Sequence, residues 1–148
     1  MPSEEVSILF RHPSRSPLRG IRRPLREFLR NTAHRIAPGR LVTCLITDDR
    51  ELRELNRRFR RKDAPTDVLS FPSSNGSSEM AISLDRAAEQ AAGFGHTVQD
   101  ELRILMLHGL LHLAGMDHET DAGEMARAES RWRKRLGLPA GLVERAHR

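Results

Sequence analysis

Apolar residues recur at helical spacing in "PLREFLRNTAHRIAPG", residues 24–39. The stripe that they form consists of Leu25, Phe28, Leu29 and Ile36. Pro24 suits the first turn of a helix, and Pro38-Gly39 ends it. The pattern therefore predicts an amphipathic helix that packs its apolar stripe against a core.

A β-branched apolar run follows, "LVTCLIT" (41–47), which predicts a buried strand with Cys44 in the core. Asp48 is a suitable N-cap, and Glu51 stands at the third helical position. These residues predict a short helix, whose core-facing side chains are expected to be Leu52, Leu55 and Phe59. A strand is thus followed directly by a helix.

Two short strands are predicted on either side of the turn "SSNGSS" (73–78). They are "DVLSF" (67–71), closed by Pro72, and "EMAISL" (79–84). In one interpretation the two strands form a hairpin; in the other, the second strand pairs elsewhere in the sheet. Periodicity alone is compatible with both.

The C-terminal half is predicted to be mainly helical. The predicted helices are "LDRAAEQAAG" (84–93) capped by Ser83, "VQDELRILMLHGLLHLAG" (98–115) capped by Thr97 with Asp100, and "DAGEMARAESRWRKRLG" (121–137). The tail from residue 138 onward is expected to be frayed. No internal repeat or linker divides the chain, so residues 1–148 are expected to form a single domain. The predicted class is α/β (α+β), with a small mixed sheet of about four strands packed by about five helices.

The formal net charge is +5, and arginine supplies nearly all of the positive charge because Lys62 and Lys134 are the only lysines. Guanidinium groups pair with phosphate, so a surface of this kind attracts polyanions, RNA above all. The alternative is that the preference for arginine reflects genomic base composition. Aromatic residues make up only 4% of the chain, which favours RNA contacts to backbone phosphates over a platform for base stacking.

Cysteine content and apolar runs indicate the compartment. Cys44 is the only cysteine, so no disulfide can form within the chain. The first residues show no secretory signal, and the longest apolar run, "ILMLHGLLHLAGM" (104–116), is too short to span a bilayer. We therefore expect a cytoplasmic protein without a membrane anchor.

Three of the seven histidines fall within "HGLLHLAGMDH" (108–118). His108 and His112 are four residues apart, so on a helix their imidazoles share one face. A glycine turn at Gly115 would let His118 return toward the same point. Three imidazoles around one open position are typical of a catalytic zinc site, although nickel, copper and iron also accept imidazole. The alternative is that these histidines are hydrogen-bonded residues of a core.

The same spacing matches the zinc motif of the metzincin metalloproteases, which need glutamate as general base beside the first histidine. This chain has Gly109 at that position, which argues against a peptidase. Asp117 and Glu119 flank His118 and either orient an imidazole or cap the following helix. Both interpretations of the two acids stay open.

Several blocks of this sequence are similar to those of one known family. They are "LITDD" (45–49), "LNRRFRRKDAPTDVLSFP" (55–72), "EMAISLDRA" (79–87) and "HGLLHLAGMDH" (108–118). On these motifs the chain resembles the YbeY family of single-strand-specific endoribonucleases, or rRNA maturation factors, over roughly residues 41–137. Two departures stand out: the family usually has glycine where Arg61 stands, and Gly-Asp where Ser78-Glu79 stand.

The resemblance implies that His108, His112 and His118 bind one zinc ion and that Arg60 is the family's functional arginine. Arg60 and Lys62 are expected to contact the substrate. Taken alone, Arg60 would be interpreted as a solvated helix end. Beside a metal, its guanidinium would stabilise the negative charge that a phosphodiester gathers in the transition state.

The resemblance further implies a zinc-dependent endoribonuclease that acts in rRNA maturation, at the 3′ end of 16S rRNA, and in ribosome quality control. The expected partners are single-stranded RNA, rRNA and the small ribosomal subunit, with no membrane and no DNA. The residues show no general base, so either a metal-activated water or the substrate's own 2′-OH would attack. A non-catalytic ribosome-assembly factor with structural zinc is the alternative from a different class.

Overall fold

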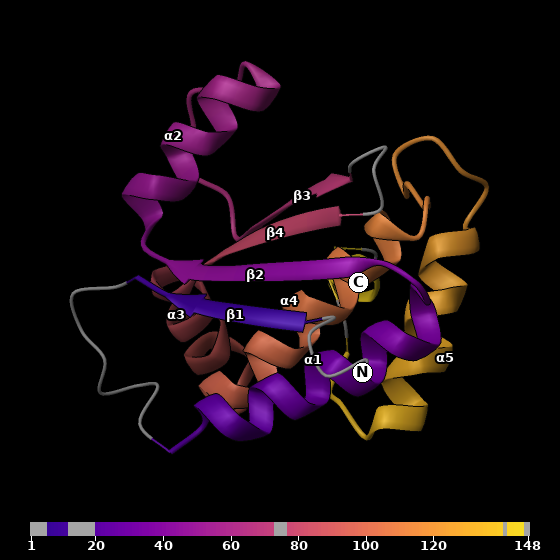
Figure 1. The fold of residues 1–148 in the computed structure, drawn as a ribbon. Coiled ribbons are helices and arrows are strands. Elements are labelled where there is room, and N and C mark those ends of the chain that lie inside the picture. Colours follow the sequence, from indigo (N-terminus) through magenta and orange to yellow (C-terminus); the bar gives the residue numbers. More distant parts are fainter. Residues whose placement is uncertain (1–5, 12–19, 73–76, 141, 147–148) are drawn as a thin grey trace.

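The computed structural model describes residues 6–11, 20–72, 77–140 and 142–146. The strands are β1 (Val6–Phe10), β2 (Leu41–Thr47), β3 (Val68–Pro72) and β4 (Ser77–Ser83). The helices are α1 (Arg22–Ile36), α2 (Asp49–Arg60), α3 (Leu84–Phe94), α4 (Val98–Leu113), α5 (Glu124–Leu136) and the short α6 (Leu142–Ala146). This architecture confirms the predicted α/β class with a mixed sheet (Figure 1).

The strands form one sheet in the order β1-β2-β4-β3. β1, β2 and β4 run parallel, and β3 pairs antiparallel with β4, with Val68 opposite Ile82. β4 pairs with β3 as in a hairpin and, on its other edge, with β2, so both pairings that the sequence left open occur. Residues 73–76, which connect β3 to β4, lie outside the described residues.

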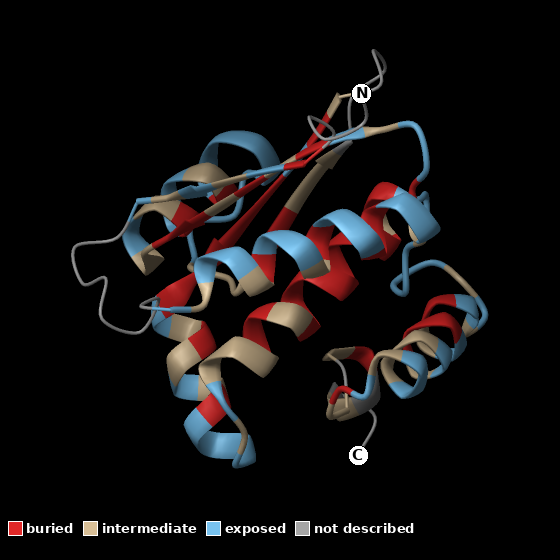
Figure 2. Ribbon diagram, turned by 60° about the horizontal axis from the view of Figure 1, so that its bottom comes forward, coloured by how far each residue is buried: buried red, intermediate tan, exposed pale blue. Residues whose placement is uncertain are grey.

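The two faces of the sheet have different partners. Side chains of alternate residues, Cys44 and Met80 among them, join the main core with α1, α3 and α4. The intervening residues of β3 and β4, Leu69 and Ala81, pack on Leu52 of α2 in a smaller cluster. Figures 1 and 2 show α2 on one side of the sheet and the other long helices on the opposite side, with their buried residues turned inward.

The structure contains the side-chain caps that were predicted at three helix starts. Asp48 accepts a hydrogen bond from the backbone N–H of Glu51, Ser83 from that of Arg86, and Thr97 from that of Asp100. Each cap satisfies a backbone donor that the first helical turn leaves without an intrahelical partner. These local signals place the starts of α2, α3 and α4 correctly.

Three features differ from the expectations. Phe59, predicted to face the core, is 60% exposed, because α2 covers only one end of its sheet face. The tail, predicted to be frayed, contains α6, whose Val143 is buried. β1 was not among the predicted elements; it is held by its pairing with β2, where Val6 lies opposite Val42.

In the described part of the chain, no helix has the length and apolar character needed to cross a membrane.

Candidate metal centre and active site

The three histidines of the motif converge, as the spacing predicts. His108 and His112 lie one turn apart on α4, and their Nε2 atoms are 3.2 Å apart. Gly115, at φ +99°, adopts the left-handed conformation that turns the chain after α4. This turn carries His118 back, so that ligand atoms of all three residues lie within 4.8 Å of one another.

The donor set of this histidine cluster fits a metal ion. Two imidazole nitrogens on one tetrahedral zinc, at about 2.0–2.1 Å from the ion, stand about 3.3 Å apart, close to the separation between His108 and His112. The imidazoles become more exposed from His108, which is buried, through His112 to the exposed His118. A metal bound here would be held on its inner side by the buried His108, and its outer side would be accessible from the solvent.

His112 is suited to act as a ligand at neutral pH. Burial lowers the pKa of its imidazole below the usual value, and the neighbouring His108 and His118 lower it further, against a smaller opposing effect of Asp117. The neutral form of the ring therefore predominates at pH 7. Only that form offers a nitrogen lone pair to a metal.

His108 is oriented by a carboxylate that sequence reasoning missed. Its Nδ1 lies 3.1 Å from Oε2 of Glu129 on α5, and both side chains are buried. A carboxylate only accepts hydrogen bonds, so Nδ1 carries the hydrogen and the lone pair of Nε2 faces the cluster. The signal was available in the sequence, because Glu129 is an acid at helical spacing from the apolar Met125 and Trp132.

Of the two acids beside His118, Asp117 behaves mainly as a turn residue. The Asp117 carboxylate accepts a hydrogen bond from the backbone N–H of Glu119 at 3.0 Å. Its charge reaches His112 only as a minor, raising effect on the pKa of that imidazole. Of the two interpretations left open, the structure supports local capping for Asp117, and the orienting carboxylate comes from α5 instead.

Gly109 lies where α4 packs against the β3–β4 hairpin. A Cβ at this position would stand 3.1 Å from the Met80 side chain and 3.3 Å from Oγ of Ser70. Ser70 also donates a hydrogen bond from Oγ to the Gly109 carbonyl. The position is buried, so it offers no space for the glutamate that a metzincin would carry there.

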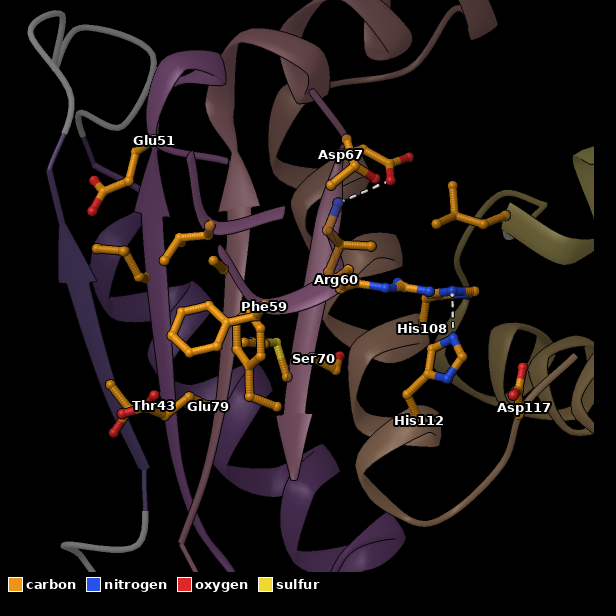
Figure 3. A pocket seen from close by; sticks show the side chains of 18 of the residues that line it. Thr43, Glu51, Phe59, Arg60, Asp67, Ser70, Glu79, His108, His112 and Asp117 are labelled. Atoms are coloured by element: carbon orange, nitrogen blue, oxygen red, sulfur yellow. Dashed lines mark hydrogen bonds between the residues drawn. The ribbon is translucent and has the colours of Figure 1, made fainter. Parts of the chain in front are cut away.

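A pocket of about 1210 Å³ opens beside the histidine cluster and runs along the sheet face that α2 leaves uncovered. Its lining includes Arg58, Phe59 and Arg60 from the last turn of α2, together with all three histidines. In Figure 3 the Arg60 side chain extends toward His108. The sequence motif at the end of α2 and the histidine motif, 48 positions apart between Arg60 and His108, thus meet at one pocket.

The other predicted contact residue, Lys62, is exposed just beyond α2 and is not among the residues that line this pocket. Before it, Arg61 ends α2 with φ +56°, the only non-glycine residue with positive φ in the described part of the chain. Glycine adopts this conformation without steric cost. Arg61 therefore holds a backbone conformation that glycine would adopt at lower cost.

Comparison with known proteins gives consistent results. The sequence pattern of the family described as Endoribonuclease YbeY matches residues 15–137. A protein named Endoribonuclease YbeY from Solibacter usitatus is 54% identical over 144 residues, covering 96% of this chain and 95% of its own length. One of the same name from Koribacter versatilis is 57% identical over 106 residues, 70% of each chain. A Thermotoga maritima protein solved in solution has a similar structure, with a TM-score of 0.59, 29% identity and coverage of 88% of this chain and 89% of its own.

Proposed function

This chain belongs to the endoribonuclease YbeY family, and from that premise we propose that it cuts single-stranded RNA with the help of zinc held by His108, His112 and His118. The observation that supports this proposal most strongly is the convergence of the three imidazoles at a pocket that Arg60 also lines. Metal ligands and a phosphate-binding cation at one opening are the parts that phosphodiester hydrolysis needs.

The three imidazoles supply the binding groups for the metal, and zinc is the ion that such a set suits best. Zinc, when bound there, supplies Lewis acid chemistry and lowers the pKa of water toward about 7. Glu129 keeps the ligand nitrogen of His108 directed at the cluster. The protein interior thereby fixes His108 before any substrate arrives.

Arg60 is proposed to bind the scissile phosphate. It is exposed on the last turn of α2 and lines the same pocket as the histidines, from the opposite side. A guanidinium placed there stabilises the charge that develops on the non-bridging oxygens during cleavage more strongly than the charge of the ground state. Lys62, exposed two residues later, is proposed to contact a phosphate outside the pocket.

Phe59 adds a surface for an RNA base. Its ring is exposed within the pocket lining, with its centroid 5.2 Å from that of Phe71 and the Arg58 guanidinium 5.4 Å away. The composition of the chain favoured phosphate contacts alone, yet this one aromatic stands beside the proposed phosphate site. We propose that an unpaired base next to the cut stacks on Phe59, which a duplex would not allow.

Ribosomal RNA is the substrate that family membership and the arginine-rich composition support. We propose that the protein acts in the cytoplasm on the small ribosomal subunit, in maturation of the 3′ end of 16S rRNA and in ribosome quality control. The open pocket, with histidines on one side and arginines on the other, would accept a strand that the ribosome presents unpaired.

Cleavage assays on one RNA sequence, offered single-stranded and as a duplex, test this proposal. We expect the single strand to be cut, cutting to stop after treatment with a chelator, and zinc to restore it. A substrate with 2′-deoxy at the cut site separates the two routes, because continued cutting would exclude attack by the 2′-OH. Zinc-loaded protein that binds RNA and leaves it intact would overturn the proposal in favour of a ribosome-assembly factor.

A further inference from the structure

The C-terminal helix α6 makes a buried hydrogen bond to the carboxylate that orients His108. The backbone N–H of Val143 donates to Oε1 of Glu129 at 2.8 Å, while Oε2 of the same carboxylate lies 3.1 Å from Nδ1 of His108. One carboxylate thus connects α6 with a residue of the histidine cluster. α6 follows the residues matched by the family pattern, which end at 137.

α6 is also held by an ion pair inside the protein. Both guanidinium Nη atoms of Arg145 lie 3.0 Å from the carboxylate oxygens of Glu101, and the two side chains are 6% and 0% exposed. The Arg145 guanidinium stacks over the ring of Phe94 at 4.3 Å. Nε2 of His96 approaches the same carboxylate at 2.6 Å. A paired, bidentate geometry is the one in which two buried charges are tolerated.

These contacts form a closed path through three helices. Glu101 and His108 stand on the same helix, α4. The path leaves α4 at Glu101, passes through Arg145 and Val143 of α6, reaches Glu129 of α5, and returns to α4 at His108. The two hydrogen bonds of Glu129 are buried and those between Arg145 and Glu101 are partly buried, so contacts among the three helices fix the imidazole.

We propose that α6 is a positioning element of the histidine cluster: the Val143 N–H fixes the Glu129 carboxylate, which holds His108 as a metal ligand, and the Arg145–Glu101 pair fixes α6. The inference rests on the proposed role of His108 as a ligand. Val143 and Glu129 are positioning residues, since neither belongs to the group of three that would touch the metal. Partners of this kind typically change metal affinity by about 10–100-fold when removed.

Glu129→Gln tests the carboxylate with almost no change of shape. An amide has one accepting oxygen and one NH₂ group in place of two accepting oxygens, so it cannot serve the N–H groups of both His108 and Val143 as the carboxylate does. We expect the zinc dissociation constant, measured by competition with a chromophoric chelator, to rise about 10–100-fold. In the metal-free protein, the ¹⁵N shifts of His108 should report a changed tautomer. Unchanged affinity with an unchanged tautomer would overturn the proposal, whatever the loss of stability.

A matched pair at Val143 tests the link from α6. Val143→Pro removes the donating N–H, whereas Val143→Ala keeps it and removes only side-chain packing. We expect weaker zinc binding for the proline variant and wild-type zinc binding for the alanine variant, with circular dichroism confirming that both are folded. If the proline variant does not fold, Arg145→Met replaces it, with the same expected loss of zinc affinity. Equal zinc affinity for wild type and the folded variant that lacks the contact would overturn the proposal.

Failure of this inference is distinguishable from failure of the proposed function. Wild-type protein that binds zinc through its histidines and cuts no RNA would contradict the nuclease proposal, while the affinities of the Glu129 and Val143 variants still decide the positioning role. Wild-type protein that binds no zinc at all would overturn both, because no ligand would then be in need of orientation.

Discussion

The pocket has two walls of opposite character. The histidine wall, formed by His108, His112 and His118 with Glu129 behind them, is anchored in the interior: His108 is 6% exposed and Glu129 1%. The arginine wall, formed by Arg58, Phe59 and Arg60 at the end of α2, faces the solvent, and Phe59 is 60% exposed. The comparison shows that the inner part of the proposed metal site, His108 with Glu129, is held by packing, whereas His118 and the groups proposed to meet RNA are accessible.

This difference follows from the supporting elements. α4 is buried along most of its length between the sheet and the other helices, so its side chains are held by many neighbours. α2 packs on the sheet mainly through Leu52, and Phe59 of its last turn contacts Phe71 of β3 with only part of its ring, leaving the side chain mostly exposed. Preorganised ligands favour metal binding, because less conformational entropy is lost when the ion binds. A flexible single strand needs an open surface instead.

The largest expected effect is the loss of stability caused by a substitution at Gly109, next to His108 in the histidine wall. Gly109→Glu should destabilise the protein by about 4 kcal/mol or more, because it forces a charged side chain into a buried contact with Met80 and Ser70. Equilibrium denaturation in urea measures the change. Gly109→Ala is the control, for which about 1–3 kcal/mol of overpacking is expected. A stable, folded Gly109→Glu protein would show that α4 does not lie as close to the hairpin as described.

Zinc bound to the histidine wall should stabilise the folded protein. At free zinc about 100 times its dissociation constant, the free energy of unfolding should rise by about 2.7 kcal/mol, since the ion binds the folded state. Denaturation curves with zinc and with chelator give the difference. Arg60→Ala, on the other wall, should show the same increase as wild type. Stability that is identical with and without zinc would contradict a preformed metal site.

Phe59→Ala tests whether the arginine wall contributes to RNA binding. RNA binding should weaken by about 10-fold, within the roughly 1–3 kcal/mol typical of one base stacked on an aromatic ring. Fluorescence anisotropy with a short labelled single strand measures affinity. Leu41→Ala is the matched control, because Leu41 is a similarly exposed apolar residue outside the pocket lining. Equal affinity of the Phe59 variant and wild type would remove base stacking from the proposal.

The smallest expected effect concerns the end of α2. Arg61→Gly should raise the free energy of unfolding by up to about 1 kcal/mol, because glycine adopts the left-handed backbone of this position at lower cost. Thermal and urea denaturation measure it. Arg61→Ala should give no such gain, since alanine meets the same steric penalty. A destabilising Arg61→Gly would indicate that the arginine side chain makes compensating contacts.

The sequence predicted those parts of the molecule that depend on neighbouring residues. Caps at Asp48, Ser83 and Thr97, and the spacing of the histidines, act within a few positions, and the structure confirms them. The pairing of β3 with β4 needed the structure, because the same apolar pattern fits either partner in a sheet.

The parts that were missed depend on contacts between distant residues. β1 is a short segment whose strand conformation is fixed by pairing with β2, and α6 is held by Glu101, 44 positions before Arg145. Phe59 has the helical spacing of a core residue, yet its contact with Phe71 leaves it 60% exposed. Glu129 is recognised as part of the site only once α5 lies beside His108.

The most direct test of the two-wall account measures zinc content and RNA cleavage together for wild type, His112→Ala and Arg60→Ala. The account predicts about one zinc per chain and cleavage for wild type, and loss of both for His112→Ala. It predicts that Arg60→Ala keeps the zinc and cuts about 10²–10³-fold more slowly. An Arg60→Ala protein that cuts at the wild-type rate, or a His112→Ala protein that keeps zinc and activity, would contradict it.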